Sequence, residues 1–262
     1  MTLKRYLIPA LAVLALALPA GAQARVIELG AGGQPPAASN CPSDPCVAAY
    51  QVTAYQGRSG TLRNPFVVPR AGRIVAFTVS LGELTPTQVT FFNGRFGMDP
   101  QVRLSILRRS TRKGKLGNHR LMAQSKVYDV SAFLGSAPTF ALDTPLRVQK
   151  DYRVAITVPT WAPLLDTVEL TRSDWWRSSR PEDECGKDDE LSPPSAQEEV
   201  GEVVDYGCTY FNSRLLYTAT YVPDPRPTDG SDKRRRPARR SSAAVSLGAG
   251  PSSPVGGGLQ AP

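Results

Sequence analysis

Residues 138–165 read PTFALDTPLRVQKDYRVAITVPTWAPLL, and this stretch decides the class of fold. Apolar side chains alternate with small or polar ones in its second half, at Tyr152, Val154, Ile156 and Val158. Phe140 and Leu142 begin the same alternation in the first half, and a polar turn at 149–151 separates the halves. A period of two is what a half-buried strand requires. The stretch therefore predicts two β-strands joined as a hairpin.

The same alternation recurs along the chain and gives eight or nine strands in all. Further strands are predicted at 47–55, 66–68, 73–81, 101–107, 121–130, 168–170 and 214–222. The segment from Thr85 to Pro100 contains Asn93-Gly94 and is predicted to be a strand plus a turn, or a long loop. No segment combines a helical period with caps. We therefore predict an all-β fold, a single antiparallel β-sandwich of jelly-roll type, because long excursions separate the strands.

Residues 1–24 have the composition of a secretory signal peptide. Lys4 and Arg5 precede an apolar run at 7–20, and Ala22-Gln23-Ala24 supplies the small-residue cleavage site. The alternative is a membrane anchor, but the run is short for a span of ~20 apolar residues. Cleavage would leave Arg25 as the first residue, and no second apolar stretch is long enough to cross a bilayer.

Three parts follow the signal peptide. Residues 25–45 are rich in glycine and proline and are predicted to form a flexible lead-in. Residues 46–222 are predicted to form the sandwich domain. Residues 223–262 are rich in proline, glycine, serine and arginine, and we predict a disordered basic tail.

The basic charge belongs mostly to that tail. The formal net charge is +8, and loss of Lys4 and Arg5 with the signal leaves 29 basic and 23 acidic residues, or +6. From Asp224 onward there are seven basic and three acidic residues, so the tail carries +4 and the rest +2. The charge therefore does not predict nucleic-acid binding. It is typical of electrostatic adhesion to an anionic surface polymer or a phospholipid surface, or of a solvated tail without function.

Few residues are candidates for catalysis. His119 is the only histidine, set in the basic stretch 108–120, which we predict to be an exposed loop without a nucleophile elbow. Asp166, Glu169 and Asp174 are candidate paired carboxylates, but sequence does not place them at the fixed separation that glycoside hydrolysis needs. We predict no catalytic residue and no cofactor.

Ten acidic residues lie between Glu182 and Asp205, against Lys187. Oxygen ligands of this kind bind calcium, but the stretch lacks the Asp-x-Asp-x-Asp-Gly order. We favour a solvated acidic loop and predict no metal site.

Three tryptophans, Trp161, Trp175 and Trp176, lie at the ends of predicted strands. Their rings either stack on the sugars of a ligand or close the ends of the core. The sequence leaves both alternatives open.

Four cysteines allow three pairings, and export makes oxidation the expected state. We predict the disulfides Cys41–Cys46, across a Pro-Ser-Asp-Pro turn, and Cys185–Cys208, around the acidic stretch. The alternative joins the N-terminal pair to the C-terminal pair. Zinc is disfavoured because Cys41 and Cys46 are not matched by a second close ligand pair.

Four segments in order carry a resemblance: PFVVPRAGRIVAFTVSLG (65–82), VRLSILRR (102–109), FALDTPLRVQKDYRVAITVPTWAP (140–163) and LLYTATYV (215–222). The chain resembles uncharacterised exported proteins of actinobacteria whose jelly-roll domain is similar in outline to galactose-binding-like modules. The resemblance covers residues 48–222 and implies the fold and the export. It assigns no functional residue.

The sequence thus predicts a secreted, non-enzymatic structural or interaction module that acts at the cell surface or in the medium. A carbohydrate-binding module that uses the tryptophans is the second hypothesis, and a secreted hydrolase is the third. The predicted partner is a cell-envelope glycan or an anionic surface polymer, with no nucleic acid and no membrane span after signal removal.

Overall fold

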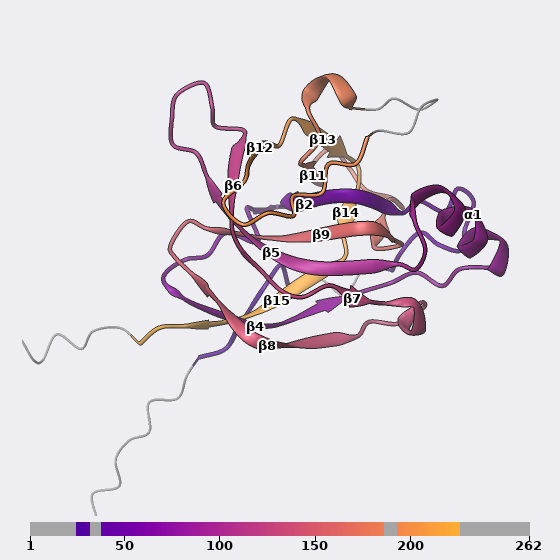
Figure 1. The fold of residues 1–262 in the computed structure, drawn as a ribbon, viewed down its shortest axis with the longest axis horizontal. Coiled ribbons are helices and arrows are strands. Elements are labelled where there is room, and N and C mark those ends of the chain that lie inside the picture. The colour runs from indigo at the N-terminus through magenta and orange to yellow at the C-terminus, as the bar shows by residue number, and fades with distance from the viewer. Residues whose placement is uncertain (1–24, 32–37, 186–192, 226–262) are drawn as a thin grey trace, which may run out of the picture. The chain divides into compact units, whose positions relative to one another are not determined.

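The computed structural model describes residues 25–31, 38–185 and 193–225, and the fold is an all-β sandwich (Figure 1). The predicted signal peptide (1–24) and the tail from residue 226 lie outside these residues. Strands of four residues or more are β2 (Ala49–Ser59), β4 (Gly72–Val79), β5 (Gln101–Arg109), β6 (Asn118–Gln124), β8 (Thr139–Val148), β9 (Arg153–Ala162), β11 (Trp175–Ser178), β13 (Cys208–Phe211) and β15 (Tyr217–Pro223). Shorter strands are β1 (Ile27–Leu29), β3 (Leu62–Arg63), β7 (Tyr128–Asp129), β10 (Leu165–Asp166), β12 (Val203–Asp205) and β14 (Arg214–Leu215). The remaining elements are α1 (Pro86–Phe96) and 3-10 turns at Ser131–Phe133 and Glu182–Glu184.

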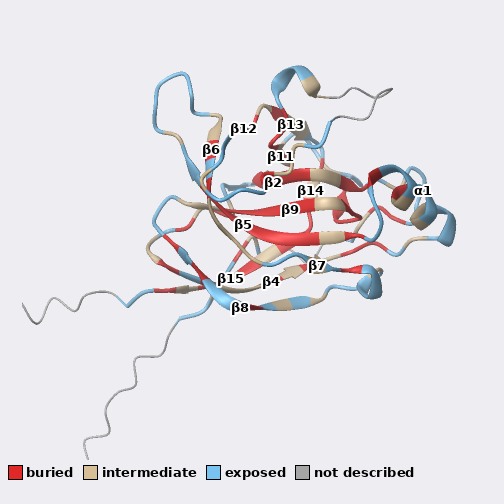
Figure 2. Ribbon diagram, viewed as in Figure 1, coloured by how far each residue is buried: buried red, intermediate tan, exposed pale blue. Residues whose placement is uncertain are grey.

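Two antiparallel sheets enclose the core. The small sheet has the order β1-β15-β4-β8, and the large sheet has the order β12-β6-β5-β9-β2-β11-β13. Both sheets contain buried stretches (Figure 2). Fully buried side chains from both, such as Phe77, Ile106 and Tyr221, belong to one apolar cluster. The chain changes sheet between β2, β4 and β5 and again between β6, β8 and β9, which are crossings of the jelly-roll type.

The stretch 138–165 forms the two predicted strands, but the predicted hairpin is wrong. β8 pairs with β4 in the small sheet, whereas β9 pairs with β2 and β5 in the large sheet. The connection between them crosses the sandwich and is fixed to a neighbouring segment: Val68 N–H donates to the Tyr152 carbonyl at 2.8 Å, and Asp151 N–H donates to the Val68 carbonyl at 2.9 Å. Alternation is identical in a hairpin and in such an arch, so it predicts strands and not their partners.

The segment 85–100 contains α1, and the predicted strand or loop is wrong. Thr85 caps this helix in both directions: its hydroxyl accepts from Gln88 N–H at 3.3 Å, and the Gln88 side chain accepts from Thr85 N–H at 2.9 Å. Pro86 occupies the first helical position, where its missing N–H costs nothing.

The apolar side of α1 covers one end of the large sheet. Phe92 stacks on Trp161 with ring centroids 5.0 Å apart, and Phe96 stacks on Tyr50 at 4.0 Å. The indole N–H of Trp161 donates to Asn93 Oδ1 at 3.0 Å, so a residue of the predicted turn satisfies a buried donor.

Part of the predicted lead-in is a strand. Residues 27–29 form β1, which pairs with β15 and gives the small sheet its edge, with Ile27 opposite Tyr221. The prediction of a flexible segment is therefore wrong at these positions. The predicted strand at 168–170 is also absent, and Leu165–Asp166 form β10 instead.

Both predicted disulfides are confirmed. Cys41 is bonded to Cys46 and Cys185 to Cys208, with Cα atoms 4.6 Å and 5.3 Å apart. Two disulfides indicate a protein that folds in an oxidising compartment.

Residues 193–207, here called the covering segment, lie over the outer face of the large sheet. Gln197 N–H donates to Thr53 Oγ1 at 2.9 Å, and its side-chain amide donates to the carbonyls of His119 (3.1 Å) and Glu202 (2.8 Å). Tyr206 is fully buried in a small cluster with Tyr55, Leu107, Leu121 and Ala155. The large sheet is therefore covered on both faces here.

Candidate functional site

A cleft of about 1140 Å³ opens where β5 turns into β6 and where β8 leads into β9. One wall consists of residues 108–112, 115, 116, 118 and 120, and the other of residues 150–153. Asn64, Val67 and Val203 complete the lining. We call this the basic cleft. Its walls are the ends of strands β5, β6 and β9 and the connections that lead to them, and the β5–β6 connection is exposed (Figure 2).

The lining carries cations with little compensation. Its basic residues are Arg108, Arg109, Arg112, Lys115, Arg120, Lys150 and Arg153. Asp151 is the one acidic residue of the lining. Within the described residues, the ion pairs are Arg103–Glu198, Lys126–Asp143 and Arg214–Asp174, and none uses a cation of the cleft. Seven cations against one anion make a strongly positive local potential, which attracts negative ligands.

The β5–β6 connection is held by its own backbone. Ser110 N–H donates to the Asn118 carbonyl at 2.8 Å, Lys115 N–H to the Arg112 carbonyl at 3.0 Å, and Asn118 N–H to the Lys115 carbonyl at 3.1 Å. Gly114 takes a positive φ of 75°, which allows the chain to reverse without strain. Arg112 and Lys115 are therefore carried on a formed turn, and the other cations of this wall lie at the ends of the two strands that it joins.

Arg153 is the most deeply placed cation of the cleft. Its guanidinium carbon lies 4.7 Å from the centroid of the Tyr55 ring, and Nη1 donates to Asn64 Oδ1 at 3.1 Å. Its Nε has no hydrogen-bond partner among the described residues. Burial is the main cause that lowers the pKa of Arg153, and the charges of Arg109 and Arg177 add to it. A bound anion would offset this desolvation and repulsion.

The structure corrects the prediction for His119. The residue lies in β6 and not in an exposed loop, and only 1% of it is accessible. Nδ1 donates to the Gly117 carbonyl at 2.7 Å, since a carbonyl only accepts, and Nε2 has no partner among the described residues. Burial lowers the pKa of His119 to about 3, so the imidazole is neutral near pH 7. His119 and the apolar Leu121 are two positions apart on the same strand, so their side chains share a face. This alternation was the sequence signal for the burial of His119.

The three tryptophans do not form one exposed platform. Trp161 lies under α1 and is fully buried. Trp176 is 4% accessible, stacks on Tyr210 at 4.2 Å and donates its indole N–H to Ser213 Oγ at 2.7 Å. For both residues the structure agrees with the alternative that they close the core, because their burial leaves no ring face for a ligand. Trp175 is partly exposed and packs against Gly57, where an added Cβ would lie 1.8 Å from its ring.

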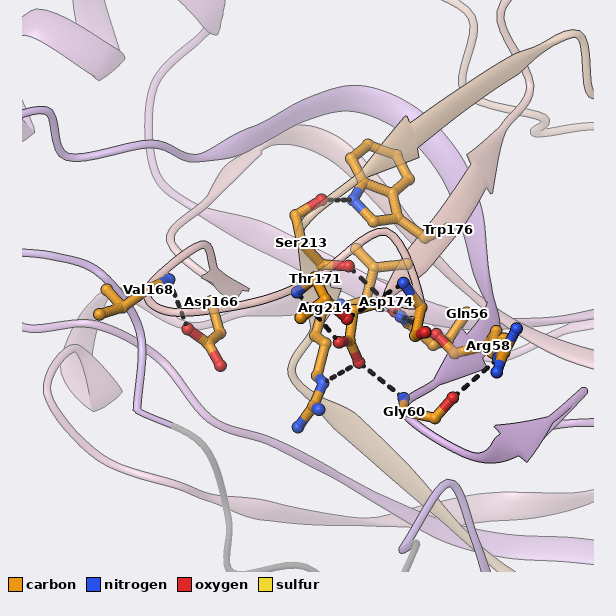
Figure 3. Close-up of polar contacts among 12 residues, drawn as sticks. Gln56, Arg58, Gly60, Asp166, Val168, Thr171, Asp174, Trp176, Ser213 and Arg214 are labelled. Carbon is orange, nitrogen blue, oxygen red and sulfur yellow. Dashed lines mark hydrogen bonds and ion pairs between the residues drawn. The ribbon is translucent and has the colours of Figure 1, made fainter.

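The candidate carboxylates lie at the end of β10 and in the loop that follows it, and they do not form one site. Buried Asp166 accepts from Val168 N–H at 3.0 Å, and Glu169 is exposed. Asp174 accepts from Gly60 N–H at 2.8 Å and from Arg214 Nε at 2.6 Å (Figure 3). Burial opposes ionisation of Asp174, but these hydrogen bonds and the charge of Arg214 outweigh it and hold its pKa below the ordinary value. Asp166 and Asp174 therefore fix the backbone at Val168 and Gly60, and Asp174 also pairs with Arg214.

The acidic stretch is described only in part, because residues 186–192 lie outside the described residues. In the part of the chain that the structure describes, no three metal-ligating side chains converge. The calcium alternative therefore gains no support from the described residues.

The comparisons with known proteins give no relative: no protein-family model, curated protein or solved structure matches this chain. Within the described residues, no helix has the length and apolar character that a membrane span needs. The basic cleft is therefore the feature from which a function is inferred.

Proposed function

We propose that this chain is a secreted, non-enzymatic interaction module whose basic cleft binds an anionic polymer of the cell envelope. The observation that carries the proposal is the lining itself, with seven cations, one acid and no ion pair to a cleft cation within the described residues. The cations come from two facing walls, so a chain of negative groups that lies between them contacts both.

The size of the cleft favours a polymer over a small molecule. Small-molecule pockets measure about 300–1,000 Å³ and are mostly apolar. This cleft has about 1140 Å³ and a cationic lining. Five of its seven cations are arginines, whose planar guanidinium groups bind carboxylate and phosphate in a bidentate manner. A glycan or polyol chain with such groups is the matching ligand class.

The composition of the cleft disfavours nucleic acid. Grooves for single strands combine cations with several aromatic rings on which bases stack. Tyr152 is the one aromatic residue of the lining, and it is half-buried. The two disulfides, together with the signal peptide predicted from the sequence, support an extracellular or wall-associated location.

Charge reversal at the cleft tests the proposal. The variant Arg112→Glu/Lys115→Glu changes two exposed side chains that make no hydrogen bond within the described residues. Binding is measured by biolayer interferometry on polygalacturonate, poly(glycerol phosphate) and neutral dextran. We expect the natural chain to bind at least one anionic polymer in a salt-sensitive manner, and the variant to bind it about tenfold or more weakly.

The matched control is Arg95→Glu/Arg172→Glu, which changes the net charge equally on exposed residues outside the cleft. It should keep most of the affinity. An equal loss in both variants would show that net charge and not the cleft governs binding, and would contradict the proposal. Binding to dextran would instead support the carbohydrate-binding alternative, for which Trp175 is the partly exposed tryptophan.

A further inference from the structure

A second recess, of about 410 Å³, lies on the other side of residues 64–67 from the basic cleft. Asn64 and Val67 line the basic cleft, whereas Pro65 and Phe66 line this pocket. Residues 59–62, around the turn after β2, and residues 214–218, from β14 into β15, supply most of the remaining lining. Its volume lies within the range of about 300–1,000 Å³ typical of small-molecule sites.

A single cation, Arg214, reaches this pocket in a fixed orientation. Its Nε–H donates to Asp174 Oδ1 at 2.6 Å, and the same oxygen accepts from Gly60 N–H at 2.8 Å (Figure 3). Asp174 is 3% accessible and is thus an interior anchor. In Figure 3 the two outer nitrogens of Arg214 make no marked contact with the residues drawn. Asp174 therefore holds the guanidinium through Nε, and Nη2 lies 4.0 Å from the position of a Cβ built on Gly60, which also lines the pocket.

The other walls are apolar or carry hydroxyl groups, apart from Gln56, whose amide is already hydrogen-bonded to backbone. Phe66 and Tyr217 stack with ring centroids 4.1 Å apart and an interplanar angle of 11°. The Tyr217 hydroxyl is already used, since it donates to the Val154 carbonyl at 3.0 Å. Leu62, which is 39% accessible, stands at the pocket with its side chain partly free. Phe66 is only 3% accessible, so the apolar surface open to a ligand comes mainly from Leu62 and the partly buried Pro65.

We propose that this pocket binds a small organic monocarboxylate, with its carboxylate on the outer N–H groups of Arg214 and its apolar body against Leu62 and Pro65. A planar carboxylate matches the fork of a guanidinium. A phosphate monoester is disfavoured because its second negative charge would face a site whose one cation already has Asp174 as its partner. Orientation of Arg214 before binding lowers the entropy cost of ordering it.

Binding of matched acid and amide pairs tests this. The probes are 3-phenylpropionate, cyclohexanecarboxylate and N-acetylleucine, each against its carboxamide, titrated into the full chain by calorimetry. We expect at least one acid to bind with a Kd below about 1 mM, and its amide to bind about tenfold more weakly. Arg214→Lys keeps the charge beside Asp174 but loses the planar fork, and it should weaken the acid about tenfold.

Thr61→Trp fills the mouth of the pocket from an exposed position without changing Asp174 or Arg214. It should abolish binding of the acid while the thermal transition is retained. The control Arg112→Glu/Lys115→Glu lies in the basic cleft and should leave acid binding unchanged, which separates this proposal from the proposed function. The proposal is overturned by any of three results: no saturable binding of all three acids, equal binding of acids and amides, or undiminished binding by both pocket variants.

Discussion

The imidazole of His119 lies 4.6 Å from the ring of Tyr206, centroid to centroid, beneath the covering segment. The packing keeps the imidazole neutral, because burial lowers its pKa from 6.5 to about 3. Below about pH 6.5, His119 therefore binds a proton in the unfolded chain but stays unprotonated in the folded chain until the pH is close to 3. The contribution of the neutral His119 to the free energy of unfolding is fully present above about pH 6.5, and it is lost as the pH falls from there toward about 3. Near pH 5 the loss is about 2 kcal/mol.

Urea unfolding at about pH 7 and about pH 5 measures this, because carboxyl groups titrate mostly below that window. The variant His119→Phe removes the titrating group and should show a flatter profile. If the natural chain and His119→Phe lose the same free energy of unfolding between the two pH values, His119 does not cause the pH dependence.

Gln197 should be a critical residue for stability. It is fully buried, its amide donates to two carbonyls, and its Oε1 accepts from the Tyr206 hydroxyl at 3.0 Å. Gln197→Ala leaves these groups buried without partners and should lower the free energy of unfolding by about 2–4 kcal/mol.

The control for this prediction is Gln124→Ala. Gln124 also donates to the covering segment, at the Glu198 carbonyl (2.8 Å), but from a more exposed position. A loss of about 1 kcal/mol or less is expected there. Equal losses in the two variants would mean that burial of the Gln197 network does not decide its contribution.

Removal of the disulfides should have unequal effects. Cys185 and Cys208 are 23 positions apart, and Cys41 and Cys46 are 5 apart. In the chain-entropy model the longer loop contributes about 3 kcal/mol and the shorter about 2 kcal/mol. Denaturant unfolding of Cys185→Ser/Cys208→Ser and Cys41→Ser/Cys46→Ser gives the comparison. A larger loss in the second variant would contradict the entropic account.

The tail after Pro225 should be dispensable for folding. Asp224 N–H still donates to the Ala71 carbonyl at 3.0 Å, and Pro223 ends β15, so the cut belongs after residue 225. The removed part includes the basic residues at 233–240. A chain that ends at Pro225 should keep its melting temperature and lose part of its salt-sensitive adhesion to anionic vesicles. A fall of the melting temperature would show that the tail supports the fold.

Sequence alternation predicts most of the long strands because the pleat imposes it wherever one face is buried. It does not predict β-partners: Thr139 pairs with Thr78 and Arg153 with Leu107, which are contacts far apart in the chain. The helix α1 was missed because Asn93-Gly94 suggested a turn, although Thr85-Pro86-Thr87-Gln88 carries a capping box. Packing of the helix on Trp161 outweighs the weak helix propensity of Asn93 and Gly94.

The sequence indicated only one wall of the basic cleft. The cations at 108–120 form one run, but Lys150 and Arg153 join them only through the crossing between β8 and β9. The pocket beside Arg214 gave no signal, because Asp174 and Gly60 are 114 positions apart and meet through the sheet.

β15 stands between β1 and β4 in the small sheet, and Thr220 donates to Glu28 across 192 positions of the chain at 2.9 Å. Among the described strands, the last in the chain is thus the one that joins the first to the rest of its sheet. A nascent chain that has not reached Tyr217 lacks this connection and cannot complete the small sheet. Folding dominated by such distant pairings is slow, in the range of about milliseconds to seconds, and the sandwich closes only after synthesis of the domain is finished.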